Sequence, residues 1–262
     1  MKYLVWILSL SFLMLSCSAS QKLGGTKKVT RKMTTLVVGI PGEWGDLIPS
    51  LQHTAYADAM LSNEYESLIR LGSGGVAQPL AAKKWKIEGN FTKFIFTIDT
   101  SLKFSNGKKL SAQDFKNAWE HSLTLKPKSS NNSLQDILYR VVGFEQRKKN
   151  KGIKGLIVRD NETFIVKFKK PFRMGLEQLT GSRMAVFYKE NGNYYGTGPF
   201  VFTKRDRGVA EMKVNPYSKY EPSFSKIVYK KINANESVKL LNNNEIQLFM
   251  FADRTQIDDC KN

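Results

Sequence analysis

Histidine and cysteine are scarce in this sequence of 262 residues. Each occurs only twice, and the two histidines, His53 and His121, lie far apart along the chain. No HExxH, paired CxxC or GxSxG motif is present, so the residue groups that usually hold zinc or activate a nucleophile are missing. We therefore expect a protein that is not an enzyme and that needs no metal or cofactor. Both histidines are expected to have ordinary surface or packing roles.

Long apolar runs are also missing, apart from one near the N-terminus. This run, Tyr3–Leu15, has thirteen residues, fewer than the roughly 20 that span a bilayer. A short apolar run of this kind is typical of a cleaved export signal, and the LSCS motif that ends it resembles a bacterial lipobox cut before Cys17. We therefore predict a lipoprotein signal peptide over residues 1–16, a membrane-anchoring lipid on Cys17, and a flexible basic tether over residues 17–33. The alternative is an ordinary signal peptide that is cut near Ala19.

The second cysteine, Cys260, lies close to the C-terminus. If Cys17 carries a lipid, the chain has no pair of thiols left for an intramolecular disulfide. The fold must then be held together by its apolar core, for which a hydrophobic content of 41% and sixteen phenylalanines are sufficient.

Acidic residues are few in comparison with basic ones. The sequence has 23 of the former and 41 of the latter, which gives a formal net charge of +18. This excess favours anionic neighbours such as lipid headgroups and cell-wall polymers. Nucleic acid is not expected as a partner, because no motif for binding it is visible. The densest basic run, residues 147–151, follows an expected helix over Leu134–Phe144 and is predicted to be a solvated loop.

The segment from Phe94 to Leu123 carries the clearest local pattern. Apolar residues alternate from Phe94 to Ile98, which predicts a strand, and Asn106-Gly107 favours a tight turn. Ser111 is a suitable N-cap, with Asp114 three residues later as the acidic half of a capping box. The positions that follow at helical spacing are apolar or small: Phe115, Ala118, Trp119, Ser122 and Leu123.

Apolar patterns predict further elements outside this segment. A helix is expected from the stripe of Leu61, Tyr65, Leu68 and Ile69, and the glycine cluster at 72–75 is expected to be the turn that ends this helix. The further predicted elements are a strand over Leu36–Ile40, a hairpin that turns at Asp160-Asn161, strands over Phe200–Thr203, Ala210–Val214, Ile227–Ile232 and Ile246–Phe251, and a helix over Glu236–Asn242.

The order of residues from Phe96 to Trp119, FTIDTSLKFSNGKKLSAQDFKNAW, resembles the signature of the family 5 extracellular solute-binding proteins. These are the receptor subunits of ABC importers for peptides. Further blocks resemble the family in the same order, among them NEYESLIRL at 63–71, QPLAAKKWKI at 78–87 and YGTGPF at 195–200. Three positions depart from the family pattern: Ser218, Asn244 and Gln247.

The resemblance implies an α/β fold of the type II periplasmic-binding-protein kind. Residues 34–262 would form a solute-binding lobe, in which 34–76 and 191–262 make a mixed-sheet lobe I and 77–190 make an inserted α+β subdomain. The second ligand-binding lobe of the family is expected to be missing, unless a separate chain supplies it.

The same resemblance implies an exported substrate-binding lipoprotein at the extracytoplasmic face of the cell envelope. It would bind extended peptides without covalent chemistry and deliver them to the membrane subunits of an ABC permease. Glu43 would pair with a ligand amine, and Trp44 would cover an apolar side chain unless it is a core aromatic. The turn with Tyr195, Thr197 and Gly198 would align the peptide through backbone hydrogen bonds, or serve only as a turn.

One alternative function remains open at this point. The chain would then be a shortened surface lipoprotein that no longer transports and that acts as an interaction module toward anionic polymers or membranes. A truncated gene is a further explanation, because both faces of the expected strand Ile246–Phe251 are apolar.

Overall fold

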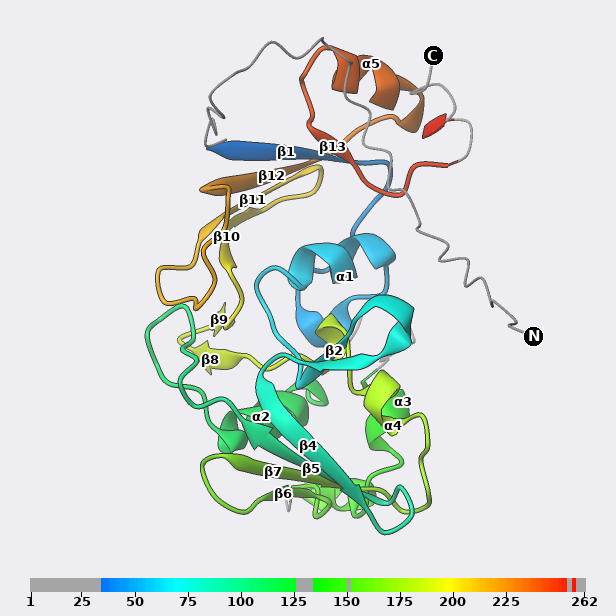
Figure 1. Ribbon diagram of the computed structural model, residues 1–262, viewed down its shortest axis with the longest axis vertical. Coiled ribbons are helices and arrows are strands. Elements are labelled where there is room, and N and C mark those ends of the chain that lie inside the picture. The colour runs from blue at the N-terminus through cyan, green and yellow to red at the C-terminus, as the bar shows by residue number, and fades with distance from the viewer. Residues whose placement is uncertain (1–33, 126–133, 150–151, 254–255, 258–262) are drawn as a thin grey trace, which may run out of the picture.

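The computed structural model describes residues 34–125, 134–149, 152–253 and 256–257. The predicted signal peptide and tether, Cys17 and Cys260 lie outside these residues. The described part is elongated, with one sheet at each end and α1 (Ala55–Leu61) between them (Figure 1). No helix in the described ranges is long and apolar enough to cross a membrane.

The first sheet has five strands in the order β10-β11-β12-β1-β13. β1 pairs in parallel with β12 and with β13, whereas β11 is antiparallel to both of its neighbours, so the sheet is mixed. Its core strand β1 comes first in the sequence, and the chain leaves the sheet after Ile40 and returns at Phe200. α5 (Ser237–Asn242) lies beyond this sheet at the end of the molecule (Figure 1). The strands are β1 (Thr35–Ile40), β10 (Phe200–Arg205), β11 (Val209–Val214), β12 (Lys226–Lys231) and β13 (Leu248–Phe249).

The second sheet is antiparallel and has four strands in the order β4-β5-β7-β6. Helix α2 (Ala112–Ser122) packs on it through aromatic side chains, and the rings of Phe115 and Phe164 are stacked with their centroids 5.8 Å apart. The indole nitrogen of Trp119 donates a hydrogen bond to the backbone oxygen of Met184 at 3.0 Å. The strands are β4 (Ala82–Glu88), β5 (Lys93–Ile98), β6 (Leu156–Val158) and β7 (Thr163–Lys167).

The strand, turn and helix predicted between Phe94 and Leu123 are confirmed. The capping box is present, and the backbone nitrogen of Ser111 donates to Asp114 Oδ2 at 2.8 Å. Gly107 has a φ of 88°, the left-handed conformation that a tight turn at this position requires. The turn and the capping box could be predicted because the interactions that define them are local in sequence.

The helix predicted through Leu61, Tyr65, Leu68 and Ile69 is wrong. α1 ends at Leu61, and Ile69 begins β2 (Ile69–Leu71). The four side chains are buried, as their spacing suggested. One helix-type bond continues past Leu61, from Tyr65 N to Leu61 O at 2.8 Å, but three of the backbone oxygens that follow accept bonds from distant segments. Those bonds are Phe200 N to Asn63 O at 3.0 Å, Gly198 N to Glu64 O at 2.9 Å and Val186 N to Glu66 O at 2.9 Å.

The glycine cluster at 72–75 therefore follows a strand and not a helix. It forms a short 3₁₀ turn, Ser73–Gly75, between β2 and β3 (Ala77–Pro79). A second small hairpin is made by β8 (Tyr188–Glu190) and β9 (Asn193–Tyr195). The predicted domain boundaries, after 76 and after 190, each lie between the paired strands of one of these hairpins. The division itself stays a prediction.

Three further predictions need correction. The helix expected over Leu134–Phe144 is reduced to α3 (Gln135–Leu138), because Val141 bridges to Phe168 and Gly143 adopts a left-handed φ of 75°. The basic run begins in a 3₁₀ helix, Phe144–Lys149, and not in a loop. The last strand is limited to β13. The remaining short elements are 3₁₀ helices at Pro49–Leu51, Ser182–Met184 and Ala234–Glu236, and α4 (Gly175–Gln178).

Candidate ligand-binding groove

A groove of about 950 Å³ opens at the carboxyl end of β1. Its walls come from the loop after β1, from β9 and from β10 with the turn that follows it. Ligands of open α/β sheets usually bind at such strand ends. The lining residues are Glu43, Trp44, Gly45, Asp46, Leu47, Ile48, His53, Glu64, Gly192, Asn193, Tyr194, Tyr195, Val201, Phe202, Arg205 and Arg207.

Glu43 lies at the exposed rim of this groove. Its carboxylate forms an ion pair with Lys231 Nζ at the end of β12. The hydrogen bond and the charge of Lys231 lower the pKa of Glu43 below its usual value. Glu43 is thus an ionised group at the rim, and a ligand amine would have to compete with Lys231 for it.

Trp44 lies at the base of the groove and is only 3% exposed. Its backbone oxygen accepts a hydrogen bond from Thr54 Oγ1 at 3.0 Å, and the same oxygen of Thr54 caps α1. The ring is therefore a core aromatic, the alternative that the sequence left open. It can give the groove an apolar floor, but most of its area is already covered.

The predicted turn residues separate into two groups. Tyr195 lines the groove, whereas Thr197 and Gly198 are buried behind it and do not reach its surface. Gly198 lies against backbone, because a Cβ at this position would come within 2.6 Å of Asn63 O. A Cβ at Gly196 would lie 1.9 Å from the backbone oxygen of Glu64. The turn is thus a close-packed joint between the two parts of the chain.

The floor of the groove contains a charged pair that was not predicted from the sequence. Glu64 is fully buried, and its Oε2 accepts a hydrogen bond from Arg205 Nη2 at 2.6 Å. The same nitrogen donates to Tyr65 Oη at 2.9 Å, and Arg205 Nη1 donates to Leu47 O at 2.5 Å. The second carboxylate oxygen, Glu64 Oε1, has no hydrogen-bond partner among the described residues.

Burial dominates the electrostatics of this pair. Removal from water raises the pKa of Glu64 to about 7, although the positive charge of Arg205 acts in the opposite direction. Burial also raises the pKa of Tyr65, so this phenol stays protonated. The groove floor therefore contains a carboxyl group that changes its charge close to neutral pH, next to a permanent cation.

The sequence contains a local signal for Glu64 but none for Arg205. Glu64 is a charged residue within a run of buried side chains, an anomaly that could have indicated it. Arg205 could not be placed from alternation, because the register of β10 shifts between Phe202 and Lys204. The irregularity brings Arg205 to the same side as Phe202, whose ring centre is 4.5 Å from the guanidinium carbon.

The described residues offer no group of three or more His, Cys, Asp or Glu side chains that could hold a metal ion. The groove combines acidic, basic and aromatic groups. Such a lining is suited to reversible binding of a ligand that carries both charges and apolar groups.

Comparison with known proteins identifies the family. Residues 76–262 match the model of the bacterial extracellular solute-binding proteins, family 5 Middle. The chain belongs to this family. It is 27% identical over 232 residues to the dipeptide-binding protein DppE of Bacillus subtilis (strain 168), a match that covers 80% of this chain and 42% of DppE. The oligopeptide-binding protein OppA of the same organism is 30% identical over 131 residues, or 49% of this chain and 23% of OppA.

Solved structures show the fold. OppA of Burkholderia pseudomallei superposes with a TM-score of 0.70 at 18% identity, over 83% of this chain and 46% of that protein. The periplasmic binding protein DppA of Helicobacter pylori, solved with the peptide STSA, gives 0.72 at 16% identity, over 87% and 49%. This family member therefore has the type II periplasmic-binding-protein fold, with part of its mixed-sheet lobe. It spans less than half the length of the curated relatives that it matches.

Proposed function

We propose that this protein is the extracytoplasmic substrate-binding component of an ABC-type peptide importer. It binds extended peptides without covalent chemistry and passes them to the membrane subunits of a permease. The observation that carries this proposal is the groove at the end of β1, with its buried Glu64–Arg205 pair and aromatic walls. The names of the relatives, a dipeptide-binding and an oligopeptide-binding protein, point in the same direction.

The chemistry of the groove is suited to a peptide. A peptide is a zwitterion with apolar side chains, and the lining has carboxylates, two arginines, and the rings of Tyr194, Tyr195 and Phe202. Charge-assisted hydrogen bonds from arginine to a terminal carboxylate are among the stronger polar contacts. In this proposal Glu43 and Tyr195 contact the ligand directly, Trp44 supplies the floor, and Thr197 and Gly198 hold the wall in place.

The groove is open on one side, and a ligand buried on one side only loses contacts that give affinity. A second lobe, supplied by a separate chain, is the proposed source of the opposite wall.

Binding of a mixed peptide library to the purified chain, followed by native mass spectrometry, tests the proposal. We expect one peptide to be retained per chain at micromolar concentration. Arg207→Gln removes an exposed cation of the groove and should weaken retention about tenfold, since a charge-assisted hydrogen bond contributes more than a neutral one. Lys239→Gln, which removes an exposed cation from α5, away from the groove, is the matched control and should leave retention unchanged. A folded chain that retains no peptide would contradict the proposal.

The lipid anchor on Cys17 and the position at the cell envelope belong to the same proposal. Metabolic labelling with radioactive palmitate should mark the protein, and Cys17→Ser should abolish the label. Cleavage near Ala19 without any label would instead support the ordinary signal peptide.

A further inference from the structure

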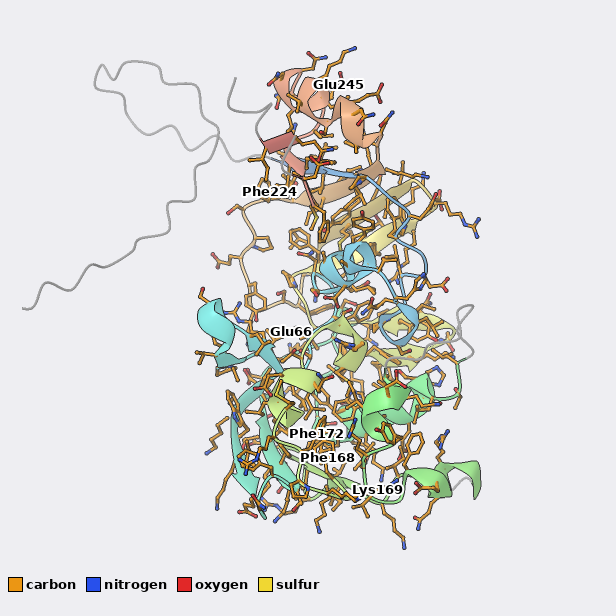
Figure 2. All side chains as sticks on the ribbon, turned by 90° about the vertical axis from the view of Figure 1, so that its right-hand side faces the viewer. Glu66, Phe168, Lys169, Phe172, Phe224 and Glu245 are labelled. Atoms are coloured by element: carbon orange, nitrogen blue, oxygen red, sulfur yellow. The ribbon has the colours of Figure 1, made fainter. Side chains whose placement is uncertain are left out.

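The end of the molecule farthest from the five-stranded sheet carries an exposed basic surface. We call it the basic tip and define it as residues 139–142 and 167–174. Figure 2 shows Phe168, Lys169 and Phe172 at this end, opposite Glu245. Backbone hydrogen bonds join the two segments, from Val142 N to Lys167 O at 2.9 Å and from Lys169 N to Arg140 O at 2.8 Å.

The basic tip has a strong local excess of positive charge. The stretches 134–149 and 167–178, which contain it, include eight lysines and arginines but only three acids. One of these acids, Glu145, pairs with Lys169 at 2.5 Å. Arg140, Lys170 and Arg173 are exposed and have no acidic partner among the residues that the structure describes. Repulsion between these cations is reduced when an anionic surface approaches.

Apolar side chains are exposed among the cations. Tyr139 is 45% exposed, Val142 37% and Met174 56%, which makes three of the large exposed apolar residues of the described chain neighbours in one place. Two arginines lie over aromatic rings, so that their apolar faces cover rings while their N–H edges remain available. The guanidinium carbon of Arg140 is 4.9 Å from the ring centre of Tyr139 and 5.0 Å from that of Phe172.

The second stacked arginine involves strained backbone. Arg173 lies 4.9 Å over the ring of Phe91, which occupies the turn between β4 and β5. Phe91 has a φ of 63°, and this left-handed conformation is unfavourable for a bulky side chain. The backbone oxygen of Phe91 accepts a hydrogen bond from Phe172 N at 2.9 Å. The ring is therefore held against the basic tip although the local backbone does not prefer it.

We propose that the basic tip docks onto an anionic lipid bilayer. Lysine and arginine side chains pair with lipid phosphates, while tyrosine, methionine and valine side chains enter the interfacial region between headgroups and acyl chains. A soluble polyanion would require the cations alone, so the exposed apolar groups favour a membrane. This docking does not depend on the groove at the carboxyl end of β1, and the two proposals can fail separately.

Cosedimentation with vesicles tests the docking. The chain from Ser18 onward keeps every residue that the structure describes and carries neither the signal peptide nor a lipid. We expect it to bind vesicles of phosphatidylcholine with phosphatidylglycerol and to release them in high salt. It should not bind vesicles of phosphatidylcholine alone. The triple variant Lys169→Gln, Lys170→Gln, Arg173→Gln should bind about 100-fold more weakly, because each cation near such a surface contributes about fivefold.

The matched control removes the same charge elsewhere. The control replaces three exposed lysines of the five-stranded sheet and α5 by Gln: Lys213, Lys230 and Lys239. This change should weaken vesicle binding by less than about tenfold, because it lowers only the overall positive charge of the protein. Equal losses in the two triple variants would overturn the proposal, as would the absence of any binding to the anionic vesicles.

A third variant distinguishes binding to a membrane from binding to a soluble polyanion. Met174→Gln keeps the charge and should weaken vesicle binding about fivefold, because part of a methionine side chain no longer leaves water. Its retention on heparin should not change. If Met174→Gln bound vesicles normally while the basic triple variant lost heparin and vesicles alike, the partner would be an anionic polymer and the membrane proposal would be wrong. Circular dichroism of all variants verifies that they fold.

Discussion

Replacing Glu64 by glutamine should change how the stability of the protein depends on pH. The amide keeps the shape of the side chain but cannot ionise. In the native protein, burial raises the pKa of Glu64 from its ordinary 4.5 to about 7. An acid with a higher pKa in the folded state binds more protons there than in the unfolded chain, so its contribution to stability is full below pH 4.5 and is lost as the pH rises through 7.

The size of the effect follows from the two pKa values. At about 1.4 kcal/mol per pKa unit, the difference between about 7 and 4.5 corresponds to about 3 kcal/mol of free energy of unfolding. Glu64→Gln does not lose this contribution. The stability of the variant relative to the native protein should therefore increase by about 3 kcal/mol between about pH 4.5 and about pH 8. A constant offset between the two proteins is expected in addition, because Arg205 keeps a different partner in the variant.

Urea denaturation at a series of pH values, followed by tryptophan fluorescence, measures this difference. Comparison with the native protein cancels the contributions of other groups, such as the buried Glu66, whose pKa is also raised by burial. Glu43→Gln is the control, since the pKa of Glu43 is lowered by Lys231 and its contribution changes only at more acidic pH. A difference between Glu64→Gln and the native protein that does not vary with pH would refute the reasoning.

Three further substitutions test local packing and capping in the fold. Gly196→Ala should lower the free energy of unfolding by about 3 kcal/mol or more, because its Cβ would lie 1.9 Å from the backbone oxygen of Glu64; thermal unfolding measures it, and an unchanged melting temperature would contradict the close approach. Ser111→Ala should lower stability by about 1 kcal/mol through loss of the N-cap, and a loss within error would show that the cap is not formed in solution. Trp119→Phe should lower stability by about 2–3 kcal/mol, because it leaves the backbone oxygen of Met184 without its donor and opens a cavity. Urea denaturation measures the stability of the Ser111→Ala and Trp119→Phe variants.

Local interactions explain most of what could be predicted from the sequence. The alternation over Phe94–Ile98 and the capping box at Ser111 are each defined by neighbouring residues, and both were found. The periodicity through Tyr65 and Leu68 correctly indicated burial, but it could not show that the backbone of this segment bonds to residues more than 100 positions away. Helical spacing and irregular buried backbone look alike when the partners come from distant segments.

The candidate site was predicted only in part, because some of its residues depend on contacts between distant segments. Glu43 follows a predicted strand, Tyr195 lies in a turn that resembles the family pattern, and the structure brings both to one groove. Arg205 depends on an irregularity in the pairing of β10 with β11, and Glu64 depends on Arg205 to offset its burial. The irregularity has no signal within a short stretch of sequence.

Hydrogen–deuterium exchange with and without a bound peptide is the most direct test of the central claim, that this family member binds peptides in the groove at the end of β1. Peptides retained from the library would be added to the purified chain. We predict slower exchange in the three groove segments, residues 43–48, 192–195 and 201–207, and no change in the sheet made by β4 to β7. Slower exchange at other places, or the absence of any peptide that alters these three segments, would contradict the account.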